Sequence, residues 1–317
     1  MSSNPDTAVG KRGWRLRSDV RGAAVPWFDL CVLYAILLAV VLADVVMVFA
    51  GGFKVVPGGL WSDSAYAGLF ILVGVIYAVT RRSSAIASLL FVVAALVLGG
   101  PATLVLDFVT KAMGYPFVDG ALSAWDGRLG LDWVGYERWF SGHPLLSLTA
   151  GFLYSGSTLV LLLAFFVLAW TGRLRGMTRL AVASALTLIA SAIVSGFLPA
   201  AGPHHFYGVP DGGKAFWVDT IIRVVTERPR LIVLNGQPPL TTFPSFHTTL
   251  AVLATMACWR IRRFGVIFAL FNLYWGLAIP VWGSHYFIDM LVGAFIAAAG
   301  YWLTAGILRQ PGPDIPA

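Results

Sequence analysis

The sequence predicts an all-α membrane protein, a polytopic bundle of about eight transmembrane helices. Hydrophobic residues make up 58% of the 317 residues and charged residues only 12%. That is about half the charge density of an ordinary soluble domain. The mean hydropathy of +0.79 agrees with this composition. The hydrocarbon layer of a bilayer is therefore the expected solvent for most of the chain.

The apolar residues gather in eight stretches, and a membrane-spanning helix needs about 20 such residues. The second and sixth stretches are short and need tilting or flanking residues to cross a bilayer. The stretches cover residues 28–50, 65–80, 84–106, 144–170, 180–198, 243–259, 264–282 and 284–307.

Basic residues fall between alternate stretches, and this pattern predicts the orientation of the helices. With eight spans, every basic cluster and both termini lie on one side, which the positive-inside rule makes the cytoplasm. We interpret the net charge of +7 as this topological signal, so no nucleic-acid partner is expected. The clusters occupy residues 11–21, 81–82, 173–179, 260–263 and Arg309.

The whole chain is predicted to form one integral membrane domain. Its interfacial segment mixes tryptophans with charges, which suits structure at the level of the lipid headgroups. Its outward loop is rich in Gly and Pro, and loops of such length are usually functional or disordered. Residues 1–317 divide into a basic cytoplasmic tail (1–25), N-terminal helices (28–106), the interfacial segment (107–143) and further helices (144–307) that include the outward loop (199–240).

Two of the five histidines stand at the predicted outer ends of helices, where they can meet. His247 begins the sixth stretch and His285 begins the eighth. Asp289 follows His285 by four residues, which on a helix places both side chains on one face, one turn apart. A carboxylate there fixes the imidazole tautomer and leaves the other nitrogen as a nucleophile or base. The alternative is that these are hydrogen-bonded structural residues, the more common role of a histidine at a membrane edge.

The residues around these histidines form two short motifs. Phe243 through His247 read Phe-Pro-Ser-Phe-His, and His285 through Asp289 read His-Tyr-Phe-Ile-Asp. They resemble the second and third motifs of the type-2 phosphatidic acid phosphatase superfamily, in the wording of its inositol phosphorylceramide synthase-like branch. Residues 125–133 and 198–203 are similar to further segments of that branch, so the resemblance covers roughly residues 120–295. It implies a six-helix phosphatase- and transferase-like core within the bundle.

The resemblance also implies a phosphohistidine mechanism without a metal or other cofactor. His285, oriented by Asp289, would attack the phosphorus of a lipid phosphate ester. His247 would protonate the leaving oxygen and then activate water or an acceptor alcohol. The implied partners are a lipid phosphate and, for a transferase, an acceptor such as ceramide or diacylglycerol.

The chain departs from the superfamily's phosphatases at two cationic positions. A lysine seven residues before Arg228-Pro229 is replaced by Ile221, and an arginine six residues before His285 is replaced by Ile279. Other groups must then neutralise the phosphate, unless the loop cations are simply solvated. The candidate phosphate-binding residues are Ser245, Lys214, Arg223, Arg228 and Arg230.

Three functions remain open at this point. The preferred one is a membrane lipid phosphotransferase that moves a phosphate-containing headgroup to a lipid alcohol. A lipid phosphate phosphatase is the alternative, and a transporter or proton-relay protein is a third. Inverted repeats and broken midplane helices would favour a transporter, and the sequence shows neither. The site is expected on the outer face, which is periplasmic at a bacterial inner membrane and luminal in a eukaryotic Golgi.

Overall fold

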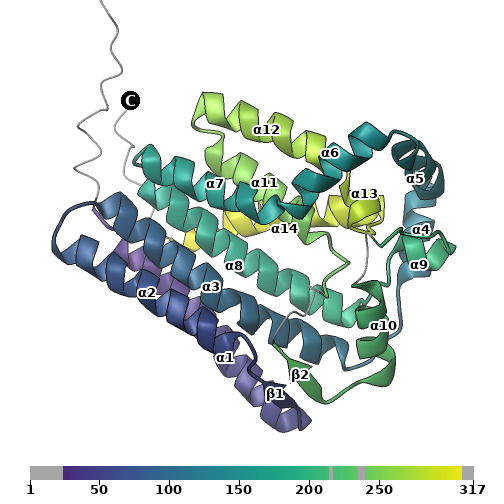
Figure 1. Ribbon diagram of the computed structural model, residues 1–317, viewed down its shortest axis with the longest axis horizontal. Coiled ribbons are helices and arrows are strands. Elements are labelled where there is room, and N and C mark those ends of the chain that lie inside the picture. Colours follow the sequence, from purple (N-terminus) through teal and green to yellow (C-terminus); the bar gives the residue numbers. More distant parts are fainter. Residues whose placement is uncertain (1–23, 214–216, 235–239, 309–317) are drawn as a thin grey trace, which may run out of the picture.

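A computed structural model describes residues 24–213, 217–234 and 240–308. These residues form fourteen helices and one ribbon of two short strands (Figure 1), which confirms the predicted all-α polytopic bundle. The basic tail, Lys214 and Arg309 lie outside the described residues.

The elements follow one another along the chain with mostly short connections. The N-terminal part holds α1 (Trp27–Gly51), β1 (Lys54–Val56), α2 (Leu60–Val79) and α3 (Ser84–Lys111). The middle part holds α4 (Asp119–Arg128), α5 (Trp133–Ser141), α6 (Pro144–Ser155), α7 (Ser157–Trp170), α8 (Leu174–Phe197), α9 (Pro203–Tyr207), α10 (Val218–Glu227) and β2 (Leu231–Val233). The C-terminal part holds α11 (Phe246–Cys258), α12 (Arg262–Gly276), α13 (Ile279–Trp282) and α14 (Phe287–Ile307).

All eight apolar stretches are helical, but they differ in length. Five described helices, α1, α2, α3, α8 and α14, are long and apolar enough to cross a membrane. A sixth span exists if α6 and α7, which meet at a bend of 59°, are counted together. Helices α11 and α12 have 13 and 15 residues, fewer than the roughly 17 that a crossing needs. The structure therefore supports a multi-pass protein, while the count of eight crossings stays a prediction.

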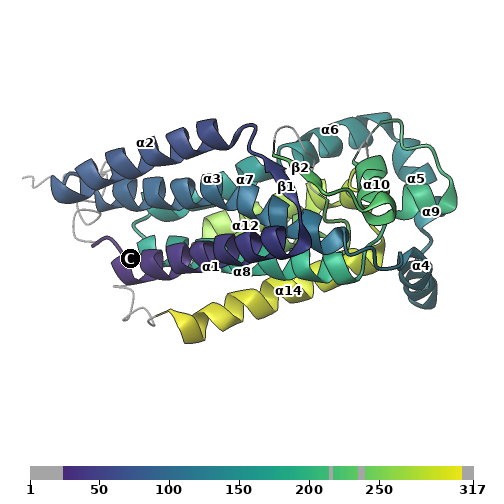
Figure 2. The same cartoon turned by 90° about the horizontal axis from the view of Figure 1, so that it is seen from below.

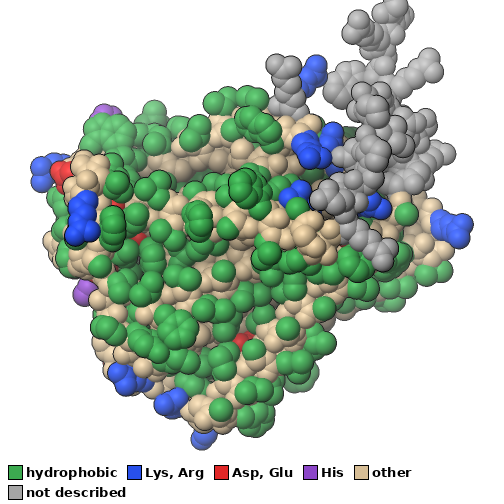
Figure 3. Space-filling view, turned by 180° about the vertical axis from the view of Figure 1, so that it is seen from behind, with side chains coloured by type: hydrophobic (Ala, Val, Ile, Leu, Met, Phe, Trp, Pro, Cys, Tyr) green, Lys and Arg blue, Asp and Glu red, His purple; other side chains and the backbone are tan. Residues whose placement is uncertain are grey.

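The long helices share one apolar core, and their outer surface is apolar too. Phe165 and Leu168 of α7, Leu180 of α8 and Leu253 of α11 are fully buried in this core. Hydrophobic side chains also cover the middle of the face seen in Figure 3, with the lysines and arginines near its margins. A helix bundle that is apolar inside and outside is typical of a protein surrounded by lipid.

The polar connections gather at the two ends of the bundle. At one end, Thr178 at the start of α8 donates a hydrogen bond to Asp29 of α1. At the same end, Arg179 donates to the Tyr301 carbonyl and to Thr304 near the end of α14. The short elements α4, α5, α9 and α10 and both strands lie at the opposite end, as Figures 1 and 2 show.

A parallel ribbon ties the N-terminal helices to the outward loop. Lys54–Val56 pairs in register with Leu231–Val233. Arg230 Nη1 also donates to the carbonyl of Gly51 at 2.9 Å, and the guanidinium of Arg230 lies over the ring of Phe53. The two helices before α3 thus hold part of the outward loop in place.

Candidate active site

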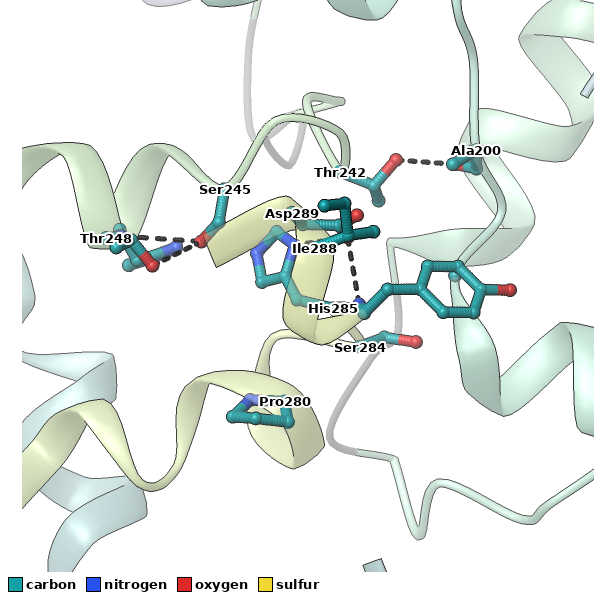
Figure 4. Close-up of polar contacts among 12 residues, drawn as sticks. Ala200, Thr242, Ser245, Thr248, Pro280, Ser284, His285, Ile288 and Asp289 are labelled. Atoms are coloured by element: carbon teal, nitrogen blue, oxygen red, sulfur yellow. Dashed lines mark hydrogen bonds and ion pairs between the residues drawn. The ribbon is translucent and has the colours of Figure 1, made fainter. Parts of the chain in front are cut away.

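The turn between α13 and α14 carries His285. The prediction that His285 and Asp289 share one helix is wrong, because α14 begins only at Phe287. Asp289 lies in the first turn of α14, and its Oδ2 accepts the backbone N–H of Tyr286 at 2.9 Å. The chain thereby folds back, and His285 Nδ1 comes within 3.4 Å of the same oxygen (Figure 4). The pairing is the predicted one, but a helix cap brings it about.

A second carboxylate caps α14 from outside. Asp126 of α4 accepts the backbone N–H of Phe287 at 2.9 Å through Oδ2 and that of Ile288 at 2.8 Å through Oδ1. The first N–H groups of a helix have no partner within the helix, and the helix dipole favours a negative charge there. Burial raises the pKa of Asp126, while these two hydrogen bonds lower it. Asp126 therefore fixes where α14 begins, two residues after His285.

Asp119, from the same short helix, fixes the neighbouring segment. It accepts hydrogen bonds from the backbone of Ala201 and Gly202 and from the hydroxyl of Tyr286. Asp119 and Asp126 are seven residues apart, which is about two helical turns and one face. Both carboxylates lie in the predicted interfacial segment 107–143, and neither has a role predicted from the sequence. The seven-residue spacing was the signal that could have found them.

His247 reaches the site because α11 and α14 approach closely. The backbone N–H of Ser245, the N-cap of α11, donates to the carbonyl of Asp289. A Cβ added at Gly293 would lie 2.4 Å from the carbonyl oxygen of Ser245, so only glycine permits this approach. As a result, the rings of His247 and His285 have centroids 6.3 Å apart. Two histidines that are distant in sequence therefore lie close together.

The electrostatic setting keeps His285 neutral. Burial, followed by the neighbouring His247, lowers the pKa of His285 to about 3, against the opposing effect of a backbone hydrogen bond with Thr242. Only the neutral imidazole has a lone pair for attack on an electrophile. Among the described residues, Asp289 Oδ1 has no hydrogen-bond partner. The arrangement can therefore present a neutral imidazole nitrogen, backed by a carboxylate, to a phosphorus atom.

The predicted phosphate-binding residues are placed in different surroundings. Ser245 is fully buried, and its Oγ accepts from the backbone N–H of Thr248 as an N-cap. Arg228 Nη2 donates to the carbonyl of Gly114 at the end of α3, and Arg230 is held by Gly51 as described above. Arg223 is exposed on α10.

Two isoleucines occupy the positions where the phosphatases have cations. Ile221 is fully buried in a cluster that includes Val224 and Ile232. Ile279 is buried in another cluster, with Trp275 and Val281. Both positions belong to the apolar core, so a charged phosphate ligand has no place in either.

A family model described as PAP2 superfamily matches residues 120–303, more than half of the chain. The chain belongs to the PAP2 superfamily. No curated protein and no solved structure matches it. The match runs from α4 into α14 and includes both histidine motifs, which confirms the resemblance at the level of the superfamily. This PAP2 protein is a membrane enzyme of the lipid phosphatase and phosphotransferase type, and its substrate is a lipid phosphate.

Proposed function

We propose that this PAP2 enzyme is a lipid phosphotransferase of the inositol phosphorylceramide synthase-like branch. In this proposal, a phosphate-containing headgroup passes to a lipid alcohol through a phosphohistidine. The supporting observation is the convergence of three residues, with His285 Nδ1 3.4 Å from Asp289 and the His247 ring 6.3 Å from the His285 ring. Residues 1–317 act in this proposal as one membrane domain.

The first half-reaction forms the phosphoenzyme. Asp289 orients His285 through Nδ1, so Nε2 attacks phosphorus and forms the P–N bond. The bond from phosphorus to the leaving oxygen breaks, and that oxygen takes a proton from His247. In the second half, neutral His247 removes the proton of the acceptor hydroxyl. The acceptor oxygen then attacks phosphorus, the P–N bond breaks, and both histidines return to their starting states.

Burial of the site favours an alcohol acceptor over water. His285 is 2% exposed and Ser284 fully buried. A transferase must keep water from the phosphoenzyme, and exclusion of water from a closed site prevents such hydrolysis. The chain also lacks, at Ile221 and Ile279, the cations that the superfamily's phosphatases carry at these positions.

The deciding experiment measures the products. The purified full-length enzyme is incubated with phosphate-labelled lipid donors, with and without ceramide or diacylglycerol. We expect the label to enter a new lipid only when the acceptor is present, with little inorganic phosphate released. Release of labelled phosphate at the same rate with and without acceptor would identify a phosphatase instead. The His285→Ala variant is the matched blank for both products.

We also propose that the active site faces the outside of the cell, or the organelle lumen, with both termini in the cytoplasm. The support is the segregation of basic residues, with Arg81, Arg173 and Arg260 at connections of the end opposite the histidines. In a chain with Cys31 and Cys258 replaced by alanine, Glu227→Cys should react with a membrane-impermeant thiol reagent in intact cells. Arg175→Cys should react only after the membrane is opened. The reverse pattern would place the site on the cytoplasmic face.

A further inference from the structure

The proton-shuttling histidine of the proposed mechanism has a neighbour that the motifs do not contain. His247 Nδ1 lies 3.1 Å from the hydroxyl oxygen of Tyr154. The two rings also face each other, with centroids 4.2 Å apart and planes inclined by 34°. Tyr154 is 5% exposed, so the contact is shielded from solvent.

The surroundings fix the position of this hydroxyl. Tyr154 is the last residue but one of α6, just before the 59° bend into α7. A Cβ added at Gly283 would lie 2.8 Å from the Tyr154 hydroxyl and 2.4 Å from Cδ2 of His285. Glycine at this position thus lets the tyrosine hydroxyl and the nucleophile's ring approach the same turn. Trp275 lies near both rings, with its centroid 6.2 Å from that of Tyr154 and 6.4 Å from that of His247.

The chemistry of a hydroxyl partner differs from that of a carboxylate. Asp289 beside His285 is suited to fixing a ring and stabilising its positive charge. A hydroxyl oxygen can accept the Nδ1–H of His247 and fix the tautomer without adding a negative charge. In the proposed mechanism, His247 gives a proton to the leaving group and later takes one from the acceptor. A neutral hydroxyl can orient its ring for both steps without stabilising its positively charged form.

We infer that Tyr154 is a positioning residue for His247: it holds Nδ1 as N–H, so that Nε2 is the nitrogen that gives and takes the proton. The inference rests on the proposed role of His247 as general acid and base. Tyr154 makes no bond to the substrate and acts only through the imidazole that it orients.

The test compares two substrates in the full-length Tyr154→Phe variant, which keeps the ring and removes the hydroxyl. One substrate is a lipid phosphate ester with an alkyl leaving group, and the other is the matching nitrophenyl ester. Proton transfer by a positioned group contributes about 10²–10⁴-fold to rate, so mispositioning should slow the first release of the leaving group about 10- to 100-fold on the alkyl ester. On the nitrophenyl ester, whose leaving group needs no proton, the first release of nitrophenol precedes the step in which His247 acts as base, and it should slow less than about threefold.

The ratio of the two rates within one preparation is the decisive quantity, because a loss of folded protein lowers both rates equally and cancels. Tyr34→Phe is the matched control, since it removes a tyrosine hydroxyl that bonds to the Phe91 carbonyl away from the site; its ratio should equal that of the parent. An unchanged ratio in Tyr154→Phe would overturn the inference.

The His247→Ala variant distinguishes a failure of the Tyr154 inference from a failure of the proposed acid and base role of His247. If His247→Ala shows the selective loss on the alkyl ester and Tyr154→Phe does not, the inference alone fails. If His247→Ala loses both substrates equally, the proposed acid role itself fails. Adding Tyr154→Phe to His247→Ala should change neither rate further, because a residue that acts only through His247 has nothing left to orient.

Discussion

Among the described residues, two of the groups of buried polar side chains differ in how fully they are hydrogen-bonded. At the end of α3, Lys111 Nζ is 2.6 Å from Asp107 Oδ1 and 2.6 Å from Ser195 Oγ, and Asp107 Oδ2 accepts from Thr241 at 3.0 Å. In the active site, the contact between His285 and Asp289 is 3.4 Å long. That exceeds the 2.7–2.9 Å typical of a charge-assisted hydrogen bond.

The difference indicates different roles. A buried polar network with every member paired makes the packing of its helices unique and rigid. Buried polar atoms without partners cost stability and call for a reason, of which catalysis is one. We therefore interpret the Lys111 network as stabilising the packing of the helices and the pair of His285 and Asp289 as taking part in catalysis. The distinction predicts which substitutions affect rate and which affect stability.

The largest effect on rate should come from His285→Ala. Loss of the nucleophile should lower turnover by about 10⁴-fold or more and abolish any phosphoenzyme that can be trapped with labelled substrate. The thermal midpoint should change little, because the buried imidazole makes only a long contact of 3.4 Å with Asp289. Asp289→Asn should keep the fold and lose an intermediate amount of rate, since it leaves the imidazole poorly oriented. Phosphate trapped on His247 would reverse the assignment of the two histidines.

Lys111→Met should have the opposite profile. It leaves Asp107 buried with only Thr241 as partner, and breaking a buried pair in this way costs about 3–5 kcal/mol of stability. Unfolding by SDS in mixed micelles measures this loss, while kcat per folded molecule should change less than about fivefold. The double variant Asp107→Leu/Lys111→Met removes both charges and should recover at least half of the lost stability. A strong loss of kcat in a well-folded double variant would make the pair part of the catalytic machinery.

The pairing of Lys111 with Asp107 also narrows the choice of basic residues that can bind the substrate phosphate. With that buried cation engaged, the cations of the outward loop remain the candidates, and Arg223 is exposed on α10. Removing a charge-assisted contact to a transition-state oxygen costs about 10²–10³ in rate. We expect that loss for Arg223→Ala at unchanged thermal midpoint, or for Arg228→Ala, which also removes the hydrogen bond to the Gly114 carbonyl. Parent-like rates in alanine variants of Lys214, Arg223, Arg228 and Arg230 would place the phosphate ligands elsewhere.

The smallest predicted effect is a missing pH dependence. Burial is the larger of the two effects that lower the pKa of His285 to about 3, and it remains when His247 is replaced. His285 should therefore stay neutral as the pH falls from 8 to 5. The rate on a nitrophenyl phosphodiester, measured in the His247→Ala background, should change less than about twofold over that range. With an ordinary histidine pKa of about 6.5, the neutral fraction and the rate would fall about 30-fold. A decline of that size would show that His285 is not desolvated as described.

Much of the fold follows from local features that a sequence displays directly. Apolar stretches long enough to span a bilayer predict helices, and all eight stretches are helical. His143 before Pro144 marks the start of α6, and Ser245 begins α11 as an N-cap. The two histidine motifs were visible because their residues are neighbours in the chain.

The partners of those motifs are decided by packing between distant segments. Tyr154 lies 93 residues before His247, and Asp126 lies 161 residues before the backbone N–H that it caps. No periodicity connects such pairs, because each contact depends on how helices cross and on where glycines such as Gly293 allow close approach. The bonds of Arg228 and Arg230 to distant carbonyls were hidden for the same reason.

The sequence by itself thus determined the class of the protein, the approximate positions of its long apolar helices and the identity of the three residues proposed to carry out the chemistry. Those properties depend on composition, on spacing and on short motifs, all of which are local. Only the tertiary structure decided that α14 begins after His285, that Asp119 and Asp126 hold that beginning, and that a tyrosine hydroxyl faces His247. A hydrogen bond is short and directional, so its partners are known only once the helices are placed.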